Sequence, residues 1–232
     1  MKGSQPTKKI KKQQIVLEKS YINNPEIKEI GVDEAGRGPM FGRVYSAAVV
    51  LPQNEIFHYE WMKDSKKFTS KKKIKEVAEY IKQNAVYWSV SYESEDIIDK
   101  VNIRNATHYA MHKAISEIVS KNPKDDFYLL IDGNDFRPYV KISENDGFNP
   151  LQHTCIEQGD NKYACIAAAS ILAKVSRDIY IDELCKNDNS LIERYDLQNN
   201  KGYGTKKHMA GIKEYGITEH HRKTFGICRQ YV

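Results

Sequence analysis

Four acidic residues of this 232-residue chain lie where a strand or helix is expected to begin or end. Asp33 and Glu34 are adjacent and follow an apolar run, and Asp132 ends a second apolar run just before a glycine. Asp160 precedes a long stretch of small apolar residues. Because side chains alternate along a strand, Asp33 and Glu34 are expected on opposite faces unless the strand bulges or ends there. Sites tend to form at strand ends, so these acids are the first candidates for chemistry.

Carboxylates that lie close together repel one another, and they are tolerated only when protonated, paired or bound to a cation. Oxygen-only sites prefer hard divalent ions such as Mg²⁺ or Mn²⁺, and two such ions can support phosphodiester cleavage. The turn Gly36-Arg37-Gly38 follows the first two acids and could bring backbone amides and a positive charge to a phosphate. Each acid alone also has an ordinary explanation, as a solvated strand end, a turn residue or a helix N-cap.

The hydrophobic pattern predicts the elements that must position these acids. Alternating or β-branched runs favour strands, and apolar residues at helical spacing favour helices. Strands are predicted within residues 28–36, 43–52, 85–92, 126–133 and 151–157, and helices within 64–83, 102–121, 163–186 and 206–216. The first two strands form a hairpin, and Thr69 or Ser70 caps the first helix. This order favours a mixed α/β sheet flanked by helices rather than a strictly alternating doubly wound fold.

Composition sets the remaining expectations. The net charge of +5 permits a nucleic-acid partner without requiring one. The four cysteines contain no CxxC pair, so we interpret them as reduced thiols of a cytoplasmic protein. There is no long apolar run for a membrane span, no secretory signal and no coiled coil, and a monomer is expected. Residues 1–27 are predicted to be a basic flexible tail, and residues 28–232 one domain with a helical C-terminal segment from about 188.

Seven stretches of the sequence resemble, in order, the motifs of the ribonuclease HII family over residues 28–226: GVDEAGRGPMFGRVYSAAVVL, DSKKFTSKKK, NIRNATHYAMHKAI, LIDGN, GDNKYACIAAASILAKVSRD, KGYGTKKHMAGIKEYG and HHRKTF. The resemblance implies a ribonuclease H-like fold with a helical C-terminal part. It implies metal-dependent endonucleolytic cleavage of the RNA strand of RNA–DNA hybrids. It also implies cleavage on the 5′ side of a single ribonucleotide embedded in duplex DNA, giving 3′-hydroxyl and 5′-phosphate ends.

The resemblance also implies roles for individual residues. Asp33, Glu34, Asp132 and Asp160 would be the catalytic acids and hold two divalent ions, Mg²⁺ or Mn²⁺. The Gly36-Arg37-Gly38 turn would sense the 2′-hydroxyl, because glycine lets backbone approach it closely. Tyr203 would stack on the next sugar, although a tyrosine in a loop is by itself more simply a surface residue.

The resemblance assigns phosphate contacts to Lys66 and Lys67, and further ones to Lys162, Lys174, Lys201, His221 and Arg222. We interpret Asp178 as structural, because it lies deep in a helical run. One alternative is a non-catalytic nucleic-acid-binding protein of the same fold, which metal-dependent turnover would exclude. Another is a metal-dependent nuclease that cuts all-DNA duplexes, against which the turn that senses the 2′-hydroxyl argues.

Overall fold

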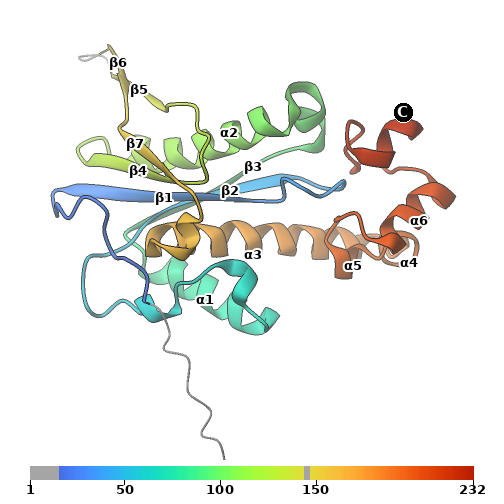
Figure 1. The fold of residues 1–232 in the computed structure, drawn as a ribbon, viewed down its shortest axis with the longest axis horizontal. Coiled ribbons are helices and arrows are strands. Elements are labelled where there is room, and N and C mark those ends of the chain that lie inside the picture. The colour runs from blue at the N-terminus through green and yellow to red at the C-terminus, as the bar shows by residue number, and fades with distance from the viewer. Residues whose placement is uncertain (1–15, 144–146) are drawn as a thin grey trace, which may run out of the picture.

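The fold is a mixed five-stranded sheet packed between helices, as predicted (Figure 1). The computed structural model describes residues 16–143 and 147–232. The sheet has the order β3-β2-β1-β4-β7. Its strands are β1 (Ile27–Ala35), β2 (Val44–Val50), β3 (Tyr87–Glu93), β4 (Asp126–Asp132) and β7 (His153–Ile156).

Strand direction changes at β1. The predicted hairpin is confirmed, because β1 pairs antiparallel with β2, which pairs antiparallel with β3. On its other side β1 pairs parallel with β4, which pairs parallel with β7. The carboxyl ends of β1 and β4 therefore lie side by side at one end of the sheet, and three of the predicted acids, Asp33, Glu34 and Asp132, lie there.

Helices cover both faces of the sheet (Figure 1). α2 (Glu95–Lys121) packs on the face that carries Ile30 and Val32, whereas α1 (Lys71–Asn84) and α3 (Ala164–Asn187) pack on the opposite face. α3 lies very close to β1, because a Cβ added at Gly31 would be 2.2 Å from the backbone carbon of Cys165. This contact needs a glycine and fixes the height of α3 above the sheet.

Local sequence explains where the first two helices begin. Ser70 caps α1, its side chain accepting a hydrogen bond from the backbone amide of Lys73, in agreement with the predicted cap. α2 starts earlier than predicted, at Glu95, and is broken at Asn102, whose φ of 68° is left-handed. The Asn102 side chain accepts from the backbone amide of Asn105, so the second half of α2 begins with its own cap.

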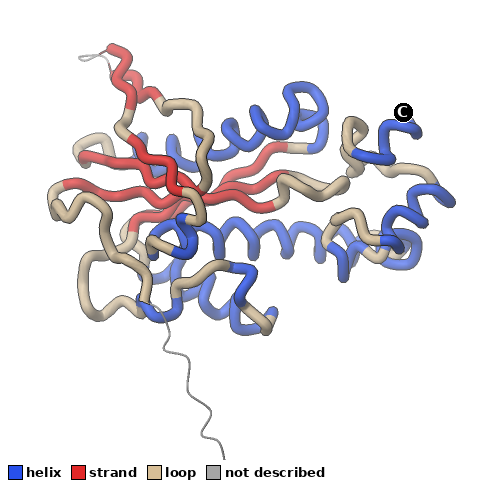
Figure 2. Tube along the Cα trace, in the orientation of Figure 1, coloured by secondary structure: helices blue, strands red, loops and turns tan. Residues whose placement is uncertain are grey.

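The C-terminal part is helical, as predicted, and lies at one end of the sheet. It contains α4 (Ser190–Tyr195), α5 (Leu197–Asn200), α6 (Lys206–Tyr215) and a final 3₁₀ helix (Gly226–Tyr231). Figure 2 shows the loop after β1 reaching toward these helices. Phe41 from that loop packs in their apolar core with Leu191, Tyr195 and Ile212.

Two segments differ from the expectations. A hairpin of β5 (Val140–Ser143) and β6 (Gly147–Pro150) occupies a stretch for which no strand was predicted. The predicted tail includes residues 16–26, yet Leu17 is buried and Glu18 bridges Tyr163. That part of the predicted tail therefore packs on the domain, while residues 1–15 lie outside the described residues. No helix among the described residues is apolar over a length that could cross a membrane.

The close contact between β1 and α3 can be tested at Gly31. Replacing Gly31 with alanine should lower the free energy of unfolding by about 3 kcal/mol, because the new methyl group meets backbone that cannot move aside. Chemical denaturation monitored by circular dichroism measures the change. The matched control is Gly38→Ala, whose Cβ would be at an ordinary 3.5 Å from Tyr203 and should change stability by less than about 0.5 kcal/mol. Equal losses would contradict the account.

Candidate active site

The parallel register of β1 and β4 brings Asp33 and Asp132 together. Gly31 pairs with Leu130 and Val32 with Ile131, so Asp33 and Asp132 extend the ladder at the strand ends. Both side chains lie on the α3 face, as their alternation with Gly31 and Leu130 requires. They line one pocket of about 230 Å³, which also contains Glu34, the Gly36–Gly38 turn and Tyr203.

Asp33 is the least exposed of the four acids, since only 5% of the residue is accessible to solvent. Burial raises the pKa of its carboxyl well above its usual value, and repulsion from Glu34 and Asp132 raises it further. The backbone amide of Glu34 donates to Asp33 Oδ1 at 2.6 Å. The Ser46 hydroxyl donates to the Asp33 carbonyl at 2.9 Å and fixes the end of β1 against β2.

Hydrogen bonds from backbone amides hold the Asp132 side chain next to Asp160. Asp132 Oδ1 accepts from the amide of Gly159 at 2.7 Å and from that of Asp160 at 3.4 Å. These amides belong to the 3₁₀ helix Gly159–Asn161, which leads into α3. Burial raises the pKa of Asp160 to about 6, and the charges of Asp64 and Asp132 add to the shift. Asp160 thus lies beside Asp132, although it does not line the same pocket.

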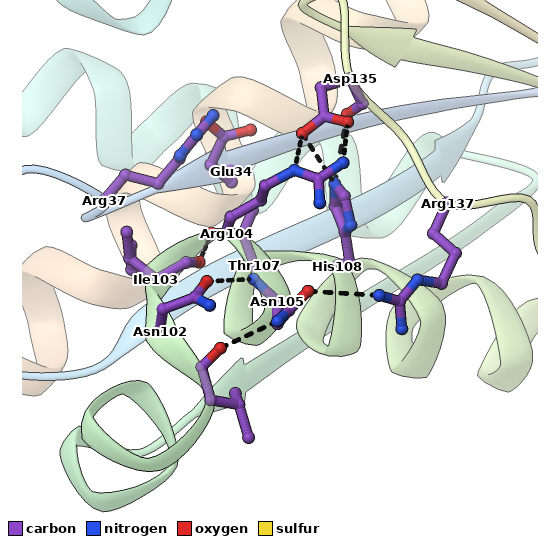
Figure 3. A network of polar contacts seen from close by, with 11 residues as sticks. Glu34, Arg37, Asn102, Ile103, Arg104, Asn105, Thr107, His108, Asp135 and Arg137 are labelled. Atoms are coloured by element: carbon purple, nitrogen blue, oxygen red, sulfur yellow. Dashed lines mark hydrogen bonds and ion pairs between the residues drawn. The ribbon is translucent and has the colours of Figure 1, made fainter.

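Glu34 extends from the other face of β1, so the predicted opposite orientation of the acid pair is confirmed. Figure 3 shows Glu34 and Arg37 beside side chains of α2 and of the segment after β4. Arg37 Nη1 lies 3.3 Å from Glu34 Oε1, and Arg104 binds Asp135 through two contacts of 2.5 and 2.6 Å. Burial raises the pKa of Glu34, while Arg37 opposes the rise. Because β1 ends here, Glu34 still reaches the pocket that Asp33 enters from the α3 face.

The turn after β1 needs glycine. Gly36 has a φ of +95°, and a Cβ there would lie 2.2 Å from Nε of the buried Arg177. Gly38 lies next to the ring of Tyr203, because a Cβ added there would be 3.5 Å from Tyr203 Cε1, an ordinary van der Waals contact. Tyr203 is 51% exposed and lines the pocket. The turn and the tyrosine therefore lie next to each other in one cavity wall.

Two of the predicted phosphate-binding lysines line the pocket. Burial disfavours the charge of Lys66, yet the carboxylates of Asp64, Asp160, Asp33 and Asp132 together raise its pKa. Lys174 lies 3.0 Å from Asp178 on the next turn of α3. Lys67 lies outside the pocket, where its ammonium group contacts the side chain of Asn161.

Three of the residues assigned to phosphate contacts are buried, and for them the expectation is wrong. Arg222 and His221 are fully buried, and Lys201 is 8% exposed and paired with Asp182. The Arg222 guanidinium donates to the carbonyls of Gly36, Arg37, Pro39 and Gly42 instead. The resemblance implied surface contacts for these residues, but the packing of the chain around them buries their side chains.

The structure adds pocket residues that the sequence did not indicate. Ser65, Ser170 and Arg177 line the cavity, and Ser170 Oγ donates to Ser65 Oγ at 3.0 Å. Asp178, which we interpreted as structural, lines it too. Ser170 and Asp178 lie in a helix that is apolar on most sides, so spacing alone gave no signal for a site. Only the packing of α3 against β1 brings them to the acids.

The donor chemistry of the acids fits hard divalent cations, because all four offer oxygen atoms only. Burial and mutual repulsion disfavour the charged form of Asp33 and Asp160, and a cation bound between the acids would favour it. As the side chains stand, no three acidic, histidine or cysteine residues of the described chain form a group that could hold a metal ion. The four acids therefore match a divalent cation in the type of donor atom and in charge, but their side chains are not arranged around a common point.

Solved structures of similar fold are nucleases. A chain in the PCNA:RNase HII complex from Archaeoglobus fulgidus superposes with a TM-score of 0.64 at 24% identity, covering 87% of this chain and 96% of that one. Bst-RNase HIII in complex with Mn²⁺ gives a TM-score of 0.63 at 20% identity, covering 89% of this chain and 69% of that one. The fold is thus that of the ribonuclease H-like nucleases.

Sequence comparison identifies the family within this class. The family model described as Ribonuclease HII matches residues 30–228. Ribonucleases HII from Bacteroides fragilis and Pelagibacter ubique are 44% and 42% identical, covering 88% and 84% of this chain and 92% and 94% of their own lengths. The chain belongs to the ribonuclease HII family, and it is a hydrolase, an endonuclease of the ribonuclease H type that acts on RNA–DNA hybrids.

The electrostatic cost of the buried acid predicts that Asp33→Asn stabilises the protein when divalent ions are absent. The free energy of unfolding at neutral pH should rise by about 1 kcal/mol, because a neutral amide removes a buried charge and its repulsion. A raised folded-state pKa means that wild-type stability is lost as pH rises above the ordinary value near 3.8. The gap between variant and wild type should therefore close below that pH.

Thermal denaturation in chelator at several pH values measures this difference. Asp125→Asn is the matched control, because hydrogen bonds from Lys28 and Tyr87 lower the pKa of Asp125 and the same substitution there should not stabilise the protein. Adding Mg²⁺ or Mn²⁺ should raise the melting temperature of the wild type more than that of Asp33→Asn. A less stable Asp33→Asn variant at neutral pH would contradict the electrostatic account.

Proposed function

We propose that this ribonuclease H cleaves on the 5′ side of a single ribonucleotide embedded in duplex DNA, as well as in the RNA strand of hybrids. The observation that carries the proposal is the pocket that the Gly36–Gly38 turn and the adjacent Tyr203 line together with Asp33 and Asp132. A turn that can approach a 2′-hydroxyl is thereby placed next to a group of carboxylates, so sugar recognition and cleavage can occur on one nucleotide.

The carboxylates are proposed to hold two divalent ions, Mg²⁺ or Mn²⁺. Asp33, Glu34, Asp132 and Asp160 would be the ligands, and a ribonuclease HIII of the same fold has been solved with Mn²⁺. Ions held by these residues would supply an activated water and stabilisation of the departing 3′-oxygen, and the products would carry 3′-hydroxyl and 5′-phosphate ends. The backbone amides that bind Asp132 hold that carboxylate in place at the strand end.

Cationic side chains around the acids would bind the phosphates that flank the cleaved bond. Lys66 lines the pocket, and its charge is stabilised by the carboxylates of Asp33, Asp132 and Asp160. Arg37 is half-exposed and borders Glu34, so it can move from that carboxylate toward a phosphate. Lys67 lies just outside the cavity and would contact the backbone further along the strand. These contacts would orient the substrate and add no sequence preference.

Recognition of the ribonucleotide would depend on backbone groups of the turn. All peptide bonds of the described chain are trans, and the carbonyls of Gly36 and Arg37 bind Arg222. The amides of Arg37 and Gly38 therefore point away from Arg222, because the N–H and C=O of a trans peptide lie on opposite sides. The Tyr203 ring would pack on the following sugar, where a 2′-hydroxyl would disturb the contact.

Cleavage of a labelled DNA duplex that holds one ribonucleotide tests the proposal. With Mg²⁺ or Mn²⁺ the enzyme should make a single cut 5′ to the ribonucleotide, and chelator should abolish it. Asp132→Asn should lower the rate at least about 1000-fold, because it removes a charged ligand. Asp126→Asn is the control, since this exposed acid lies at the opposite end of β4. Cleavage of an all-DNA duplex, or full activity of Asp132→Asn, would contradict the proposal.

A further inference from the structure

A buried chain of hydrogen bonds connects the C-terminal segment to Tyr203. The backbone amide of Thr218 donates to His221 Nδ1 at 2.9 Å, and His221 Nε2 lies 3.1 Å from His208 Nε2. His208 Nδ1 lies 3.0 Å from the carbonyl oxygen of Tyr203. Both imidazoles are fully buried. None of these groups contacts the acids of the active site, so the mechanism proposed above does not use them.

The two ends of this chain determine the tautomers of both histidines. An amide can only donate, so His221 Nδ1 must carry a lone pair and its Nε2 the hydrogen. His208 Nε2 must then accept, which leaves the hydrogen on Nδ1 to donate to the Tyr203 carbonyl. A second proton on either ring would set two N–H groups against each other. Burial lowers the pKa of His221 to about 3 and also lowers that of His208, in agreement with two neutral rings.

The next residue, Arg222, holds the other side of the pocket. Its buried guanidinium donates to four carbonyls, those of Gly36, Arg37, Pro39 and Gly42, at 2.6 to 3.1 Å. These bonds set the direction of the turn's peptide groups, as noted above. Burial and the nearby Arg177 lower the pKa of Arg222 to about 9, which means that its positive charge is electrostatically unfavourable at this position.

Adjacent residues of one segment thus hold the turn and the tyrosine that faces it. We propose that His221 and Arg222, with His208 as the link to Tyr203, are positioning residues that set the gap between the Gly36–Gly38 turn and the Tyr203 ring, and so determine selectivity for a ribonucleotide followed by a deoxyribonucleotide. The inference rests on the proposed function of that gap. A loosened tyrosine loop widens the gap and weakens the contact with the deoxyribose, whereas the carboxylates keep their places on β1 and β4.

The experiment compares two substitutions of His208. His208→Phe fills the same space but removes the bond to Tyr203, whereas His208→Asn keeps a side-chain N–H that can donate to the Tyr203 carbonyl. The readout is the ratio of the cleavage rate at a single embedded ribonucleotide to the rate on a continuous RNA–DNA hybrid. We expect His208→Phe to lower this ratio roughly tenfold, and His208→Asn to recover most of it. An unchanged ratio in folded His208→Phe would overturn the proposal.

A double substitution separates positioning from general loss of stability. If His208 acts through Tyr203, His208→Phe should change the ratio little further in a Tyr203→Ala background. An equal additional loss in that background would contradict the proposal. Rates on the continuous hybrid report the acid site in every variant. A wild type without preference for the single ribonucleotide would refute the proposed function of the gap, and that result is seen before any variant is made.

Nitrogen NMR provides a test that does not depend on the activity of a variant. The imidazole spectra at pH 7 should include a histidine protonated only on Nδ1 and at least one protonated only on Nε2, with hydrogens that exchange slowly. Loss of the Nδ1-protonated signal in His208→Asn would assign it to His208. Reversed tautomers, or a doubly protonated ring in this pair, would overturn the connection to Tyr203 irrespective of the enzyme's substrate preference.

Discussion

The repulsion between carboxylates at the ends of two parallel strands is the constraint on which the active site depends. β1 and β4 are locked in register by their ladder, so Asp33 and Asp132 cannot separate without breaking the sheet. α3 then closes over Asp33, because Gly31 allows helix and strand backbones to meet. The fold thus stores an unfavourable interaction that only protonation or a cation relieves. In the proposed site, stability and catalysis are therefore opposed at this point.

A second constraint is that the irregular Gly36–Gly38 turn must be held in one conformation, and the C-terminal part does this. Because glycine has no side chain, the backbone of such a turn can come close to a sugar, and for the same reason the turn is flexible. Arg222 replaces that rigidity with four hydrogen bonds, and Phe41 anchors the end of the turn in the C-terminal core. The sheet carries the acids of the proposed site, and the C-terminal part holds the turn and Tyr203 that we propose to recognise the ribonucleotide.

The sequence predicted the sheet and the main helices, because alternation and helical spacing are local properties, which Tyr87–Glu93 and Lys71–Asn84 display clearly. The family resemblance rested on the motifs instead. The sequence did not predict the break at Asn102 or the hairpin β5–β6, which depend on turn geometry and on tertiary contacts. The resemblance also gave a wrong expectation for Arg222 and Lys201, which it placed at a phosphate and which are buried. Burial is set by what packs around a residue, and no spacing in the sequence encodes that for a single cation.

The central claim, that burial and repulsion prepare the Asp33 carboxylate for a cation, can be measured directly by carbon NMR of the aspartate side chains. In metal-free enzyme the Asp33 carboxyl should titrate well above its usual pKa near 3.8. Saturating Mg²⁺ should return the titration to that value or below it, because a bound cation favours the charged form. A carboxyl that titrates near 3.8 without metal, or one that Mg²⁺ does not shift, would contradict the account.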